Sequence, residues 1–172
     1  MRPLAVKQVR IPEDRIGVII GEGGETKQDF EELTDCEVKI EGNVVKVEGE
    51  AFDELMAEKA VKAVGRGFNP DKALQLVEKD VAFHIINIKD FTQNSSRQEE
   101  LKGRVIGRDG ETRRHIEKEA NIDLSVYGTT VALIGKGQNI QVAVEALNML
   151  LNGSTHSTAY DYLERNQSKI VR

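Results

Sequence analysis

Two short glycine-rich segments are the residues of this sequence best suited to chemistry. Gly21-Glu22-Gly23-Gly24 and Gly107-Arg108-Asp109-Gly110 each carry two glycines three positions apart. Glycine permits a tight turn and has no side chain to hold a ligand away from the backbone. A helix is expected to start directly after each segment, where free N–H groups favour an anion such as phosphate. Both loops therefore predict a cradle for a phosphate backbone.

The two loops belong to an internal repeat. Residues 15–49 align with residues 101–135 at a constant offset of 86 without a gap, and ten of the 35 positions are identical. About two identities are expected from average residue usage. The shared positions include loop and turn glycines as well as apolar positions typical of a core. One offset for both kinds of residue indicates two copies of the same structural unit.

The elements that position each loop follow from hydrophobic periodicity and turn residues. Each copy is expected to follow the order β-α-α-β-β-α, with the loop between its first two helices. A Gly42-Asn43 turn joins two strands of the first copy. The expected strands are 4–11, 37–41, 44–48, 82–89, 122–127 and 130–134, and the expected helices include 25–34, 52–64, 111–120 and 138–151.

Two segments lie outside the repeats and complete the domain organisation. We expect a first domain over residues 1–66, a linker helix within 67–81, a second domain over 82–152 and a helical tail over 153–172. Each repeat completes its order of elements before the tail begins. The tail is therefore expected to lie outside both domain cores and to dock RNA or a protein, with packing onto the second domain as the alternative.

Composition excludes several classes of protein. The chain has 172 residues, one cysteine, no tryptophan and 5% aromatic residues. We expect no disulfide, no metal site and no cofactor, and neither a membrane span nor a signal peptide, which makes a cytoplasmic location the default. Few aromatic residues disfavour binding of nucleic acid by stacking. A net charge of −5 disfavours strong nonspecific binding, so any binding must come from a local site.

The two copies differ in charge around their loops. Residues 17–36 hold one basic and six acidic residues, whereas residues 103–122 hold five basic and four acidic ones. The first loop has Glu22 where the second has Arg108. A carboxylate repels phosphate and a guanidinium can pair with it, so the second copy is expected to dominate binding. A solvated helix face is the alternative for these charges, and RNA contact is favoured over it for Arg108, which lies inside the loop. The candidate contacts are Arg104, Gly107, Arg108, Asp109, Gly110, Arg113 and Arg114, with Gly21, Glu22, Gly23, Gly24 and Lys27 in the first copy.

The element order and the loops Ile20-Gly21-Glu22-Gly23-Gly24 and Ile106-Gly107-Arg108-Asp109-Gly110 resemble two KH domains of the eukaryotic type, type I. The resemblance covers roughly residues 4–66 and 82–152. It implies an α+β fold in which helices cover a three-stranded antiparallel sheet in each domain. It also implies that the loop clamps about four nucleotides of single-stranded RNA. The bases would lie in an aliphatic groove, which suits a chain with few aromatic residues.

The pair of KH units, the linker and the tail together resemble the archaeal two-KH proteins. These are related to the eukaryotic Krr and Dim-two (partner-of-Nob) ribosome-assembly factors. The resemblance implies binding to small-subunit rRNA near its 3′ end during ribosome assembly. It also implies contact with the Nob endonuclease or with the alpha subunit of translation initiation factor two.

Other interpretations concern proteins of different classes. A protein-interaction scaffold with mainly structural KH units is the first alternative, and the acidic first copy supports it. A nucleotide-dependent enzyme is disfavoured, because neither loop has the residues of a dinucleotide fingerprint or a Walker loop. His156 lies among serines and threonines, a pattern more typical of a helix cap than of a nucleophilic site. We therefore expect an RNA-binding protein that is not an enzyme.

Overall fold

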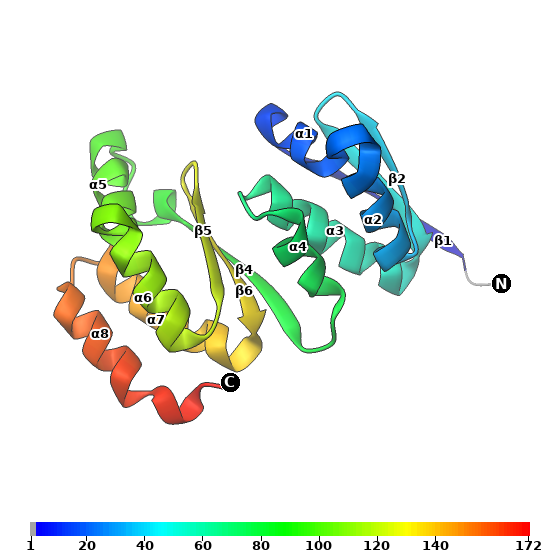
Figure 1. Ribbon diagram of the computed structural model, residues 1–172. Helices are drawn as coiled ribbons and strands as arrows, with labels where there is room; N and C mark the ends of the chain where they lie inside the picture. Colours follow the sequence, from blue (N-terminus) through cyan, green and yellow to red (C-terminus); the bar gives the residue numbers. More distant parts are fainter. Residues whose placement is uncertain (1–2) are drawn as a thin grey trace. The chain divides into compact units, whose positions relative to one another are not determined.

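The computed structural model describes residues 3–172. The chain divides into two compact units, one ending at Val81 and the other running from Ala82 to Arg172. Each unit contains a three-stranded sheet with helices packed on it (Figure 1). The expected α+β class and the expected order of elements are confirmed in both units.

The first unit is built around a central strand. Strand β3 lies between β1 and β2 and is antiparallel to both. Its side chains alternate, so that Val45 and Val47 are buried together with Val38 of β2. The elements are β1 (Leu4–Arg10), α1 (Glu13–Ile20), η1 (Glu22–Gly24), α2 (Glu25–Thr34), β2 (Glu37–Glu41), β3 (Val44–Glu50) and α3 (Ala51–Gly65).

The second unit repeats this arrangement, with sheet order β4-β6-β5. Its first helix is longer than its counterpart, with 12 residues against eight. The additional turn begins where the Asn94 side chain accepts a hydrogen bond from the Arg97 N–H at 3.0 Å, a helix cap. The elements are β4 (Val81–Asn87), η3 (Ile88–Asp90), α5 (Ser95–Ile106), η4 (Arg108–Gly110), α6 (Glu111–Ala120), β5 (Asp123–Tyr127), β6 (Thr130–Lys136) and α7 (Gly137–Leu151).

The linker and the start of the tail are equivalent parts of the two units. The linker forms α4 (Pro70–Ala73) and η2 (Leu74–Val77), and η2 packs on α3 and α2. The tail forms α8 (His156–Arg165) and η5 (Gln167–Lys169), and α8 packs on α7 and α6. Asn69 and Thr155, again 86 positions apart, cap the two segments with their side chains. The repeat therefore continues beyond the last strand of each copy and includes a further helical segment.

The prediction that the tail lies outside both domain cores is wrong. Ala159 and Leu163 have no exposed surface, and Ile170 is 9% exposed. All three belong to the same apolar cluster as Ile116 and Leu147 of α6 and α7. Because a helix with one apolar stripe is stabilised by packing it, α8 completes the core of the second unit.

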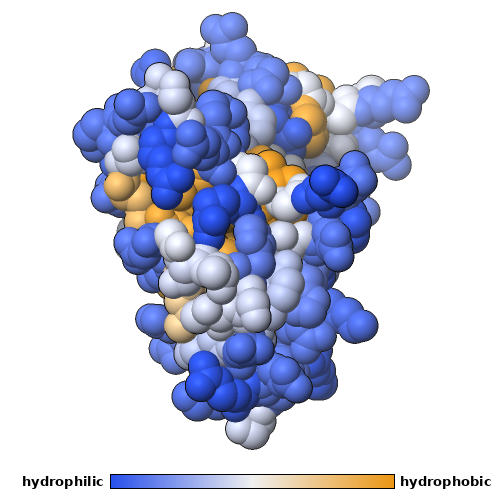
Figure 2. Space-filling model, turned by 90° about the vertical axis from the view of Figure 1, so that its left-hand side faces the viewer, coloured by the Kyte–Doolittle hydropathy of each residue, from blue (hydrophilic) through white to orange (hydrophobic). Residues whose placement is uncertain are grey.

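The surface seen in Figure 2 is largely polar. In the view of Figure 2 most side chains are hydrophilic, and hydrophobic ones are exposed in small patches. Within residues 3–172, no helix is both long and apolar enough to cross a membrane. The same residues contain no group of three or more side chains suited to holding a metal ion.

Candidate nucleic-acid interface

The second glycine loop turns the chain sharply between α5 and α6. Helix α5 ends at Gly107, whose φ is 73° and whose N–H donates to the Gly103 carbonyl at 2.8 Å. Asp109 and Gly110 follow with φ of 54° and 77°. A Cβ on Gly107 would lie 2.7 Å from the backbone nitrogen of Thr112, closer than such atoms approach. Glycine is therefore required there by the backbone conformation and by the available space.

The first loop has the same backbone conformation. Gly21 also has a φ of 73°, and a Cβ on it would lie 2.8 Å from the backbone nitrogen of Thr26. Gly23 has a φ of 60°, close to the 54° of Asp109 at the equivalent position. This middle position accepts a non-glycine residue because short Asp side chains tolerate the left-handed region. The two loops differ in their side chains and not in their geometry.

The helix that follows each loop starts without a side-chain cap. Gly24 and Gly110 stand at the cap positions of α2 and α6, and neither provides a side-chain hydrogen bond. The N–H groups of Glu25 and Glu111 donate to the loop carbonyls of Glu22 and Arg108. The N–H groups that follow them in the first turn have no partner within the helix and lie at the positive end of its dipole. Such groups are suited to hydrogen-bonding the oxygens of a phosphate.

Two arginines bring positive charge to the second loop. Arg108 is exposed, and its side chain makes no hydrogen bond or ion pair within residues 3–172. Arg114 reaches back from α6 and donates to the Asp109 carbonyl at 2.6 Å. The guanidinium of Arg114 is thereby held on the loop, whereas that of Arg108 is available to a ligand.

Arg104 and Arg113 are engaged within the protein. The Arg104 guanidinium donates to the Leu150 carbonyl at 3.0 Å and also to the Ser154 carbonyl, where α7 ends. Arg113 pairs with Glu117 on the next turn of α6 at 3.2 Å. Arg104 therefore connects α5 to the end of α7, and its guanidinium is engaged by carbonyls of the protein itself.

Arg15 makes the contacts of Arg104 in the first unit. Its guanidinium donates to the carbonyls of Val64 and Phe68, both at 2.8 Å. These acceptors are equivalent to Leu150 and Ser154 at the offset of 86, but the offset places Val18 opposite Arg104. The donor has moved by about one helical turn while the acceptors have kept their places. For that reason the alignment of the repeats does not identify Arg104 as a structural residue.

The first loop lacks an available cation. Lys27 pairs with Glu31 on the same helix at 3.1 Å. Glu22 is exposed in the position that Arg108 takes in the second loop. The structure thus places a carboxylate where the second unit presents a free guanidinium.

Sequence reasoning did not place His156 and Tyr160 beside the second loop. A pocket of about 580 Å³ lies between the loop and α8, with Arg108 and Glu111 at one side and His156 and Tyr160 at the other. The Tyr160 hydroxyl donates to the Thr112 hydroxyl at 3.2 Å. The rings of His115 and Tyr160 lie 4.1 Å apart between centroids. These contacts were not expected because the tail was predicted to lie outside the core. No neighbouring residue in the sequence shows that His156 or Tyr160 lies near the loop.

Both units match one protein family. Residues 6–65 match the KH domain, and residues 82–168 match the eukaryotic type KH-domain, KH-domain type I. The chain belongs to the KH-domain family. The expected pair of KH domains is confirmed, and the second match extends into α8, in agreement with the packing of the tail.

The chain is also similar to individual KH proteins. A KH domain-containing protein of Methanocaldococcus jannaschii is 40% identical over 174 residues, which cover 98% of this chain and 77% of that protein. The pre-rRNA-processing protein pno1 of Aspergillus fumigatus is 30% identical over 114 residues, or 64% of this chain and 45% of that protein. The chain therefore spans less than half the length of this fungal relative.

Two crystal structures from Pyrococcus horikoshii are similar over nearly the whole chain. Dim2p has a TM-score of 0.87 at 37% identity, covering 94% of this chain and 99% of that chain. A chain in the complex of a/eIF2alpha, aDim2p and rRNA has a TM-score of 0.91 at 35% identity, covering 97% of this chain and 96% of that chain. The expected resemblance to the archaeal two-KH proteins is confirmed.

Proposed function

We propose that this chain is a non-enzymatic protein that binds single-stranded RNA through its Gly-x-x-Gly loops, mainly through the second. The observation that carries this proposal is the environment of Arg108. Its guanidinium is exposed and has no partner within residues 3–172, and Arg108 lies between Gly107 and the start of α6, which no side chain caps. Backbone N–H groups and an available guanidinium together suit an RNA phosphate.

We propose small-subunit rRNA near its 3′ end as the RNA, bound in the cytoplasm during ribosome assembly. The name of the fungal relative, a pre-rRNA-processing protein, supports this role. The similar Pyrococcus chain was crystallised in a complex with rRNA and a/eIF2alpha. We extend both partners to this chain, and the Nob endonuclease is a further candidate from the family resemblance.

A second candidate function, protein interaction, is favoured for the first unit. Its loop carries Glu22, and its Lys27 is paired with Glu31. A carboxylate at the cradle and a neutralised lysine weaken attraction to a polyanion. The first unit would then keep the KH fold and contribute contacts to a protein.

The RNA proposal is tested by titrating the full chain with a short single-stranded oligoribonucleotide of the rRNA 3′-end sequence. Fluorescence anisotropy at several salt concentrations measures affinity and its salt dependence. We expect Arg108→Glu to weaken binding by about tenfold or more and to lower the salt slope. The matched control is Lys118→Glu, which makes the same charge change on an exposed side chain of α6 away from the loop. Equal losses in both variants, or no binding by the wild type, would contradict the proposal.

A further inference from the structure

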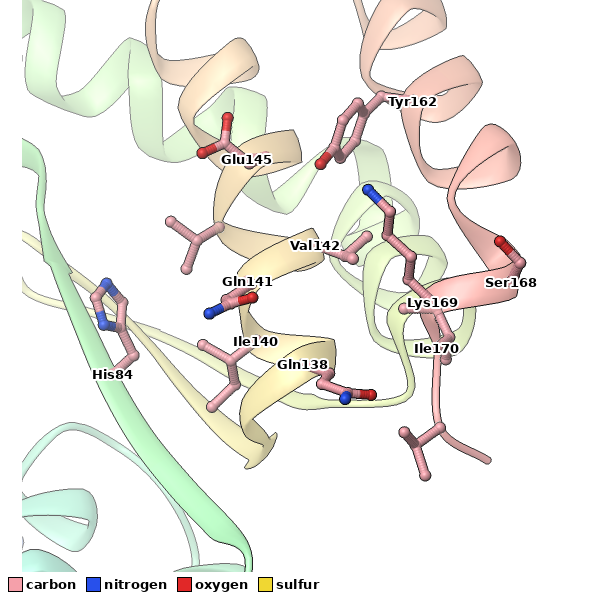
Figure 3. A pocket seen from close by; sticks show the side chains of 12 residues that line it. His84, Gln138, Ile140, Gln141, Val142, Glu145, Tyr162, Ser168, Lys169 and Ile170 are labelled. Atoms are coloured by element: carbon pink, nitrogen blue, oxygen red, sulfur yellow. The ribbon is translucent and has the colours of Figure 1, made fainter.

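The last residues of the chain form one wall of a cavity on the second unit. The cavity has a volume of about 710 Å³ and lies between α7, β4 and the residues that follow α8 (Figure 3). His84 of β4 lies on one side, Lys169 and Ile170 lie on the other, and Gln138 and Gln141 of α7 lie between them. The residues that follow α8 thus cover one side of the first turns of α7.

The C-terminal segment, Lys169–Arg172, is held by polar contacts as well as by Ile170. The Asn139 amide donates to the Val171 carbonyl at 2.9 Å and accepts from the Val171 N–H at 2.8 Å. The Arg172 guanidinium donates to the carbonyls of Lys118 at 2.8 Å and Glu119 at 3.3 Å, at the end of α6. The face between α6 and α7 therefore accepts an extended segment in which an apolar side chain is followed by a cation.

The first unit has the same face without this cover. Its linker is equivalent to the tail as far as Val77 and then leads into β4, so residues 3–81 supply no counterpart of the C-terminal segment. At the offset of 86, Leu33, Phe52 and Leu55 replace Glu119, Gln138 and Gln141. These three apolar side chains are 58%, 70% and 42% exposed. Three large apolar side chains at positions that border a docked segment in the other unit indicate an unoccupied docking face.

The charges of this face specify what it can accept. Asp53 stands at the position of Asn139, and Asp35 at that of Asn121, whose amide donates to the Val171 carbonyl at 3.0 Å. An amide can donate and accept, whereas a carboxylate only accepts. The face therefore favours a ligand rich in N–H donors and positive charge.

We propose that Leu33, Phe52, Leu55, Asp35 and Asp53, named here the α2–α3 face, dock an extended basic segment of a partner protein. The segment would have apolar side chains next to lysine or arginine, as in Lys169-Ile170-Val171-Arg172. Its apolar side chains would cover the three exposed ones, and its cations would face the carboxylates. RNA does not fit this face because the aspartates repel phosphate. The tail of a second copy does not fit it either, since Leu163 and Ile170 are buried in their own unit.

The probe for this proposal is a fluorescein-labelled peptide with the sequence of residues 166–172, titrated into the full chain. We expect saturable anisotropy and shifts of the amide NMR signals of Leu33, Phe52 and Leu55. The triple variant Leu33→Glu, Phe52→Gln, Leu55→Gln introduces the residues of the second unit and should weaken binding at least about tenfold. The matched control is Val6→Gln, a 54% exposed side chain beside Glu37 and Glu48 on the sheet. It should leave the affinity unchanged.

A second variant tests the charges independently of the apolar side chains. The double variant Asp35→Asn, Asp53→Asn introduces the residues of the second unit. It should lower the affinity for the peptide several-fold and reduce the salt dependence of that affinity. The proposal is overturned by an absence of saturable binding, by shifts confined to the second unit or by equal losses in the control. It is also overturned if the triple variant loses oligoribonucleotide affinity, or if it abolishes a dimer of the chain seen by sedimentation. Retained RNA affinity with lost peptide affinity separates this proposal from the RNA-binding function.

Discussion

The two glycine loops have the same backbone and opposite charges at their second residue. Gly21 and Gly107 share a φ of 73°, and the third loop residue, Gly23 or Asp109, is left-handed in both. The second loop residue is the acidic Glu22 in one loop and the basic Arg108 in the other. In both loops the first glycine has no room for a side chain, because a Cβ there would clash with Thr26 or Thr112. Side chains that point to solvent are free of this constraint. The comparison shows how a duplicated KH unit can keep its fold while the charge that the second residue of its loop presents changes sign.

The two units also differ in what covers the helices behind the sheet. In the second unit the chain continues to Arg172 and covers α6 and α7, whereas in the first it leaves for β4 after Val77. Ile170 is consequently buried, and Phe52 is exposed. The same face is covered in the second unit and exposed in the first.

The largest effect is expected where the tail completes the core. Leu163→Ala removes a side chain with no exposed surface and should cost about 2–5 kcal/mol of unfolding free energy. Leu55→Ala, at a 42% exposed position of the first unit, should cost less than about 0.5 kcal/mol. Urea unfolding measures both. Similar small losses would mean that α8 is peripheral to the fold.

The equality of the two loop backbones is tested at their first glycines. Gly107→Ala and Gly21→Ala should each destabilise their own unit by about 1–3 kcal/mol, because each adds a clash and a strained φ. Gly23→Asp is the control, since Asp109 already adopts that conformation in the other loop. Thermal unfolding should show a clear loss for the alanine variants and little for the control. A tolerated Gly21→Ala would show that the first loop is looser than the second.

Replacing Arg104 or Arg15, which donate to carbonyls at helix ends, should lower the stability of the protein more than its affinity for RNA. Arg104→Met and Arg15→Met each leave carbonyls at a helix end without their donor, at a cost of about 1–3 kcal/mol. Chemical unfolding measures this cost, and the oligoribonucleotide titration measures affinity in parallel. If Arg104→Met keeps the stability of the wild type but lowers the affinity for RNA as much as Arg108→Glu does, then Arg104 contacts RNA directly.

The charge difference between the loops can be reversed. In a chain carrying Arg108→Glu, the further change Glu22→Arg should restore RNA affinity by several-fold, because it provides a guanidinium on an equivalent backbone. Anisotropy with the same oligoribonucleotide detects the gain, and Glu32→Arg on the exposed surface of α2 is the matched control. An equal gain from the control would attribute the effect to net charge alone.

The smallest effect concerns Cys36, which is buried where the second unit has Ile122. Burial raises the pKa of the Cys36 thiol, and nearby carboxylates, Asp53 first, raise it further. The unfolded thiol ionises at lower pH than the folded one, so the unfolded state binds fewer protons above the ordinary thiol pKa. The free energy of unfolding should therefore fall as the pH rises above the ordinary thiol pKa, and Cys36 should not affect it at lower pH. Cys36→Ile should remove this fall in unfolding measurements near the ordinary thiol pKa, and an unchanged alkaline slope would contradict it.

Local features of the sequence were sufficient for the loops and for most element boundaries. Gly21 and Gly107 mark positions where only glycine fits, and alternation identifies β2 and β3 within one or two residues. The repeat strengthened both predictions, since one offset relates loop and core positions. The sign of charge at Glu22 and Arg108 is likewise a property of the sequence, as is the KH resemblance that carried the functional hypothesis.

Tertiary structure alone decided the roles that depend on distant partners. The burial of Leu163, the commitment of Arg104 to Leu150 and the exposure of Phe52 each result from packing between segments far apart in the chain. An apolar stripe on a helix has the same pattern whether it completes its own domain or docks a partner. An arginine likewise has the same side chain whether it binds a carbonyl or a phosphate. What distinguishes these cases is which groups fold against them, and this is determined by the arrangement of the whole unit.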